Sequence, residues 1–141
     1  MPRVGEIAVG GRRPALPPAT VRRVAAAVLR GERRDADLSV TFLGPVTMQK
    51  LNRRYKRHDA PTDVLAFGLE TPDGRTVGDV YVCAAVAARQ ARRHRVSRRE
   101  ELIRLVVHGT LHVLGHEHPE GAGRTASAMW RRQERYVERL A

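Results

Sequence analysis

The sequence predicts an α/β (α+β) fold, in which about five helices pack against a small mixed four-stranded sheet. Short segments in which apolar and polar residues alternate are separated by longer segments with helical periodicity. Two of the short segments flank the turn sequence Thr71-Pro72-Asp73-Gly74, which favours a hairpin. The run from Leu102 to Leu114 is apolar on nearly every side, which indicates a buried helix.

The first third of the chain is expected to contribute two strands and a helix. Residues Val4–Val9 form a short candidate strand. After a Gly- and Pro-rich loop, Thr20 is expected to cap a helix that runs to Leu29, because Val21, Val24, Ala25 and Val28 share one face. Apolar and polar residues then alternate over residues 38–42, which predicts a half-buried strand.

The middle of the chain is expected to hold a helix and a hairpin. Pro45, which follows a glycine, opens a helix that reaches Tyr55. Residues 58–61 form a loop, and strands are expected over residues 64–69 and 76–82. These two strands can pair across the intervening turn.

The last third is expected to be helical. An alanine-rich basic helix covers residues 84–95, and Ser97 with Glu100 forms a capping box that starts the next helix. Gly115 can end that helix in a left-handed conformation. After a loop that contains proline and glycine, a final helix is expected from about Thr125 to Leu140.

Length and composition favour a single globular domain over residues 1–141. The one cysteine, Cys83, provides neither an intrachain disulfide nor a thiolate metal cluster. The N-terminal segment lacks the apolar core of a signal peptide. No apolar run approaches the roughly 20 residues that cross a bilayer. We therefore expect a cytoplasmic protein with no membrane partner.

The chain is strongly basic, with 26 Lys and Arg against 15 Asp and Glu and a formal net charge of +11. Such a surplus favours a polyanionic partner, because each neutralised phosphate releases counterions. We expect a polyanion, with contacts at Arg53, Arg54 and Arg57. The alternatives are that arginine-rich helix faces are only solvated, or, less favoured, that they bind a membrane surface. Aromatic residues make up 4% of the chain, so base stacking is expected to contribute less than backbone contacts.

Four of the six histidines lie within residues 108–118. His108 and His112 are four residues apart, so on a helix they share one face, with Arg104 one turn before them. Buried polar groups are costly without partners, so two histidines on an apolar helix need something to bind. Three imidazoles around one open position hold catalytic zinc, and we therefore predict one Zn²⁺ per chain.

Two histidines are alternatives for the third ligand. His116 is four residues after His112 and suits an unbroken helix. Gly115 argues for a break that favours His118, and His116 is then expected to face solvent or RNA. The same spacing occurs in metzincin peptidases, but those need a glutamate directly after the first histidine, where this chain has Gly109.

The run H-G-T-L-H-V-L-G-H-E-H over residues 108–118 resembles the H-G-x-L-H-x-L-G-x-[DE]-H signature of the YbeY family, bacterial metal-dependent endoribonucleases of ribosomal RNA maturation. The resemblance covers most of residues 38–118. Upstream it extends through Leu51-Asn52, Tyr55, residues 61–67 and residues 78–80.

The resemblance implies a zinc ion bound by His108, His112 and His118, and a fold of helices packed on a small mixed sheet. The family usually has Tyr where His116 stands and Asp where Glu117 stands. An arginine implicated in the family's activity aligns with Lys56, which Arg57 follows. Lys56 and Arg57 are therefore candidate catalytic residues, although cations at a helix end also interact favourably with the helix dipole.

Three carboxylates have two interpretations each. Glu117 is a candidate general base beside the metal, or an exposed turn residue. Asp63 and Asp79 stand at or within strands, where aspartate is disfavoured. Each either orients a histidine ligand or caps a turn.

The function that fits these features is a metal-dependent endoribonuclease that acts on single-strand-type RNA in ribosomal RNA maturation and ribosome quality control. A zinc-activated water would attack the RNA phosphodiester while Lys56 or Arg57 stabilises charge on the phosphate. Expected partners are ribosomal RNA or the small ribosomal subunit, and ribosome assembly proteins. The alternatives are a zinc-containing RNA-binding assembly factor without nuclease activity, and a zinc hydrolase of another substrate class.

Overall fold

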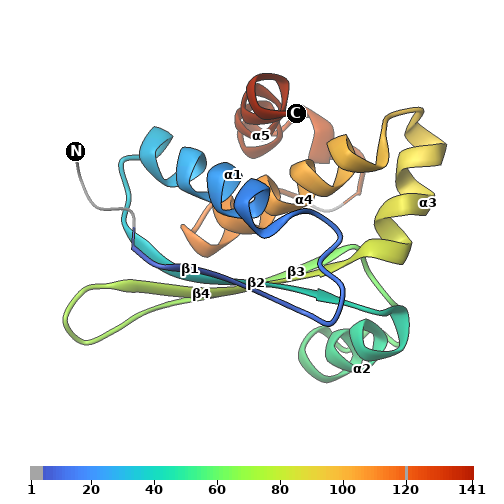
Figure 1. The fold of residues 1–141 in the computed structure, drawn as a ribbon, viewed down its shortest axis with the longest axis horizontal. Coiled ribbons are helices and arrows are strands. Elements are labelled where there is room, and N and C mark those ends of the chain that lie inside the picture. The colour runs from blue at the N-terminus through green and yellow to red at the C-terminus, as the bar shows by residue number, and fades with distance from the viewer. Residues whose placement is uncertain (1–4, 120) are drawn as a thin grey trace.

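A computed structural model describes residues 5–119 and 121–141 and contains one four-stranded sheet with helices on both faces (Figure 1). The strands, in their order across the sheet, are β1 (Ile7–Gly10), β2 (Ala36–Leu43), β4 (Thr76–Cys83) and β3 (Val64–Glu70). β2 is parallel to both β1 and β4, whereas β3 runs antiparallel to β4. The predicted mixed sheet and the predicted hairpin between β3 and β4 are confirmed.

Six helical segments follow or connect the strands in the described part of the chain. They are α1 (Pro18–Gly31), α2 (Pro45–Lys56), α3 (Ala84–His94), α4 (Arg98–Val113), the 3₁₀ helix η1 (Gly121–Ala126) and α5 (Ala128–Leu140). α1 and α4 lie on one face of the sheet and α2 on the other, while α5 lies on the side of α4 away from the sheet (Figure 1). Within the described residues, no helix is both long and apolar enough to cross a membrane.

Helix α4 is the centre of this arrangement, since it contacts α1, α3, α5 and both strands of the hairpin. Burial on all sides explains its nearly continuous apolar sequence, as predicted. The approach to the sheet is close: a Cβ atom at Gly109 would lie 2.4 Å from Val80 Cγ1 of β4. Gly109 is therefore required by helix–sheet packing, and a glutamate side chain has no room at this position.

The N-terminal elements begin at different residues from those expected. Val4, the expected start of the first strand, lies outside the described residues, and β1 begins at Ile7. Thr20 does not cap α1: the helix begins at Pro18, with Pro17 in the N-cap position and no capping side-chain hydrogen bond. Proline suits the first helical position because its fixed φ is already helical and it lacks the N–H that would stay unpaired there.

The last helix also starts later than Thr125. Residues 121–126, part of which was expected to be a loop, form η1, and α5 begins at Ala128. The Ser127 hydroxyl accepts a hydrogen bond from the Trp130 N–H at 3.1 Å. This side-chain cap satisfies one of the free N–H groups of the first turn and thereby sets the start of the helix.

Candidate functional site

Helix α4 and the turn after it place three histidines together. His108 and His112 lie one turn apart on α4, as their spacing predicted. Gly115 follows the helix with a φ of +97°, in the left-handed region that glycine favours. Its N–H donates to the His112 carbonyl at 3.0 Å, which closes the end of the helix. The chain turns back at this point, and His118 comes to lie against the other two rings.

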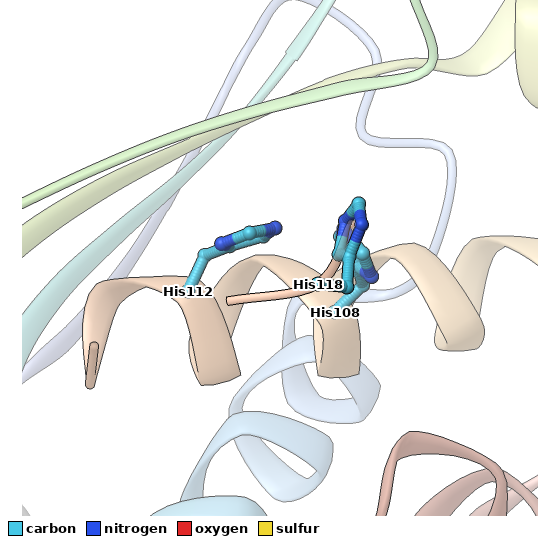
Figure 2. Close-up of side chains that lie close together, drawn as sticks. All are labelled: His108, His112 and His118. Atoms are coloured by element: carbon cyan, nitrogen blue, oxygen red, sulfur yellow. The ribbon is translucent and has the colours of Figure 1, made fainter. Parts of the chain in front are cut away.

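The three side chains point toward one another from α4 and from the loop after it (Figure 2). The ring centroids are 4.6 Å apart for His108 and His112, and 5.0 Å apart in each pair that includes His118. One nitrogen from each ring lies within 4.8 Å of the others, so the cluster could hold a metal ion. The structure thus brings together the three residues that were predicted as ligands.

Two of these rings are held in the neutral form that binds metals. Burial lowers the pKa of His108 to about 4 and the pKa of His112 also to about 4. A neutral imidazole keeps one nitrogen lone pair, whereas a protonated ring offers none. At neutral pH, His108 and His112 can therefore donate to a cation without first losing a proton.

Hydrogen bonds determine which nitrogen carries that lone pair. His108 Nδ1 lies 2.5 Å from Gln133 Oε1, and His118 Nδ1 lies 2.9 Å from the Pro119 carbonyl oxygen. Both oxygens only accept, so each Nδ1 carries its hydrogen and each Nε2 is left as an acceptor. These two Nε2 atoms face each other at 3.3 Å. Two lone pairs at that distance repel, and a cation between them removes the repulsion; the donor set therefore fits zinc.

Gln133, on α5, is a site residue that the sequence interpretation missed. It is 1% exposed, and its amide Nε2 donates to Glu134 at 3.0 Å. Glu134 in turn accepts two hydrogen bonds of 2.9 Å from Arg104, which therefore pairs with acids instead of facing the histidines. The available signal was a polar residue within the apolar stripe of the last helix, four residues after Met129.

The histidines open into a cavity of about 690 Å³ beside α4. Charged residues in its lining are Lys56, Asp63, Glu117 and Arg124. Two of the three predicted catalytic residues, Lys56 and Glu117, therefore lie at the same cavity as the histidines. Arg57 does not belong to this lining among the described residues.

The end of α2 separates Lys56 from Arg57. Lys56 Nζ lies 5.7 Å from the centre of the Phe67 ring, on the neighbouring strand β3. Arg57 has a left-handed φ of 58°, and the N–H of the next residue, His58, donates to the Asn52 carbonyl at 3.3 Å and caps the helix. The backbone of Arg57 thus ends the helix, and its side chain is exposed to solvent.

His116 faces a buried acid, not solvent or RNA as expected. His116 Nε2 lies 2.8 Å from Glu32, the residue that ends α1. Glu32 also accepts hydrogen bonds from Tyr136 and Arg132. Burial raises the pKa of Glu32, but these three hydrogen bonds outweigh it and hold the pKa below its usual value. His116 therefore links the loop after α4 to α1 and α5.

The two strand-associated aspartates take part in local contacts. The Asp63 carboxylate accepts the Val64 N–H at 2.8 Å, which stabilises its own turn. Asp79 accepts the Ser39 hydroxyl at 2.6 Å across neighbouring strands. Among the described residues, neither carboxylate has a hydrogen bond to a histidine, so neither orients a member of the cluster.

Comparison with known proteins identifies the family. Residues 16–141 match the family model described as Endoribonuclease YbeY. Proteins of that name are 40% identical over 128 residues in Moorella thermoacetica (82% of this chain, 81% of the relative) and 34% identical over 129 residues in Syntrophotalea carbinolica (86% and 85%). The solution structure of a Thermotoga maritima protein superimposes with a TM-score of 0.65 at 27% identity, covering 95% of this chain and 88% of that one. The predicted resemblance is confirmed, and the chain belongs to the YbeY endoribonuclease family.

Proposed function

We propose that this member of the YbeY family is a zinc-dependent endoribonuclease that cleaves ribosomal RNA and acts in its maturation and in ribosome quality control. The observation that carries the proposal is the convergence of His108, His112 and His118 in a cavity that also presents Lys56. The net charge of +11 favours a polyanionic substrate at this site.

Each residue around the cavity has a separate role in the proposed hydrolysis of a phosphodiester. His108, His112 and His118 would hold the zinc ion, which would act as a Lewis acid and lower the pKa of a bound water to about 7. The Lys56 ammonium group stabilises negative charge that develops on the phosphate. The Glu117 carboxylate accepts a proton from the water that attacks phosphorus, and donates it to the leaving oxygen as the P–O bond to that oxygen breaks. Arg57, beyond the cavity, contacts a neighbouring phosphate of the strand.

An aromatic surface beside Lys56 supports a single-stranded substrate. Phe67 makes edge-to-face contacts with Tyr55 at 5.3 Å and with Tyr81 at 6.2 Å. Tyr55 is 52% exposed, and the Arg54 guanidinium carbon lies 5.3 Å from the centre of its ring. Exposed rings next to cations bind unpaired bases by stacking. Aromatic residues are few, but half of them lie together here. Base stacking is therefore expected to contribute more to RNA binding than the composition suggested.

The exposed cations of α2 extend this surface. Arg53 and Arg54 lie in the last turns of the helix, before Lys56. The contact between Arg53 and Asp59 is long, at 3.9 Å, and both side chains are largely exposed. Such a surface ion pair is weak and leaves Arg53 free to bind RNA phosphates. We assign Arg53, Arg54 and Arg57 to RNA binding.

Single-turnover cleavage of a ribosomal RNA fragment tests the proposal. The zinc-loaded parent protein is expected to cut the fragment, and His112→Ala to lose both zinc and cleavage while still binding RNA. His94→Ala, a change at an exposed histidine on α3, is the control and should behave as the parent. An RNA-binding assembly factor would instead give binding without any cut product from the parent, and that result would refute the nuclease.

A further inference from the structure

Arg124 is a cation inside the cavity whose partner is missing among the described residues. It lies on η1 and is half-buried, and its side chain lines the same cavity as the three histidines. Its Nε atom is buried and has no hydrogen-bond partner in the part of the chain that the structure describes. No carboxylate among the described residues forms an ion pair with its guanidinium either.

Such an arrangement is costly unless an anion completes it. A buried donor without an acceptor loses its hydrogen bonds to water, and the loss is larger when the donor is charged. The Trp130 ring, 5.7 Å from the Arg124 guanidinium carbon, favours the cation but accepts no strong hydrogen bond. Arg104 shows the usual solution, because it is held by the carboxylates of Glu100, Glu101 and Glu134.

The position of Arg124 indicates which anion it binds. A second cavity, of about 470 Å³, shares Asp63, His108 and Arg124 with the histidine cavity, so the guanidinium stands where the two cavities meet. The Asp63 carboxylate already accepts the Val64 N–H and the Thr62 hydroxyl. An anion that enters beside His108 therefore lies next to both the histidine cluster and the Arg124 side chain, whose guanidinium has no carboxylate partner among the described residues.

We propose that Arg124 binds the phosphodiester that is cleaved, through a bidentate contact of its guanidinium group with two phosphate oxygens. This inference rests on the proposed endoribonuclease function and adds a specific phosphate-binding residue to it. Lys56, the other long cation of the lining, offers only a point charge. A planar guanidinium fixes the orientation of the phosphate as well as its charge, which aligns phosphorus with the attacking water.

Two substitutions at position 124 and one control separate charge from geometry. Arg124→Gln should remove one phosphate contact and lower the log–log salt slope for binding of a short single-stranded RNA by about 0.7. Arg124→Lys should keep that slope, because it keeps the charge. Both should slow single-turnover cleavage about 100-fold, as loss of one preorganised donor does. Arg135→Gln, at an exposed site on α5, removes the same charge and should change neither quantity.

The outcomes distinguish this inference from the function on which it rests. Unchanged slope and rate in Arg124→Gln, with cleavage lost in His112→Ala, would overturn the role of Arg124 and leave the nuclease in place. A flattened slope in Arg124→Gln with no cleavage by the parent would support the phosphate contact and refute the nuclease. A fall in thermal stability in both position-124 variants, with the slope equal to that of the parent, would show a structural role and also overturn the inference.

Discussion

Replacing Gln133 by leucine tests whether a buried amide on α5 supports metal binding by the histidine cluster at α4. Gln133 is 1% exposed and accepts the His108 Nδ1–H at 2.5 Å. Leucine fills a similar volume but accepts no hydrogen bond. The Gln133→Leu protein should therefore fold, while His108 loses the contact that fixes its tautomer and ring orientation.

The size of the effect follows from what the amide supplies. Partners of metal-ligating histidines are typically worth 10- to 100-fold in metal affinity, which is about 1.4 to 2.7 kcal/mol. We expect the zinc Kd to rise by roughly this factor. The metal-free variant is also expected to be less stable by about 1–3 kcal/mol, because a buried His108 N–H is left without an acceptor.

Competition with a chromophoric chelator measures the zinc affinity, and denaturant unfolding measures the stability of the metal-free protein. Gln49→Leu is the matched control, since the Gln49 amide on α2 donates to Asp59 at 3.1 Å and Gln49 is not among the described residues that line the histidine cavity. The control should bind zinc as the parent does. A Gln133→Leu protein with the zinc affinity of the parent would show that the hydrogen bond to His108 has no part in metal binding.

Two further predictions concern the fold around the histidines. Burial lowers the pKa of His108 and of His112 from 6.5 to about 4, so between these pH values the folded metal-free protein binds fewer protons than the unfolded chain. The free energy of unfolding should therefore be highest above pH 6.5 and should decrease as the pH falls toward 4. If denaturant unfolding gave the same free energy across this pH range, the burial argument would be contradicted. Gly109→Ala places a Cβ atom 2.4 Å from Val80 Cγ1, and the overpacking should cost about 1–3 kcal/mol despite the better helix propensity of alanine. Adding Val80→Ala should recover part of this loss in thermal unfolding; additive losses would mean that the two positions are not in contact.

Local sequence patterns account for most of the secondary structure. Alternation over residues 38–42 predicted the centre of β2, and the turn sequence at residues 71–74 predicted the pairing of β3 with β4. The predicted first residues of two helices, near Thr20 and Thr125, were wrong. In both regions several neighbouring residues can serve as the N-cap. Which residue does so depends on where packing places the first turn.

The sequence also determined the core of the candidate site. His108 and His112 share a face because the period of the helix is fixed by backbone geometry, and Gly115 allowed the break that returns His118. These are relations between residues at most ten positions apart. Composition added the positive charge and hence the class of partner, because net charge does not depend on the fold.

Only the tertiary structure decided the contacts between distant elements. The acceptor for His108 comes from Gln133, the acid that holds His116 comes from Glu32, and Arg124 enters the cavity from η1. Periodicity shows that a side chain is buried, but it does not show which other element the chain path brings against it. Those partners are fixed by the packing of α1 and α5 on α4, which depends on the whole core.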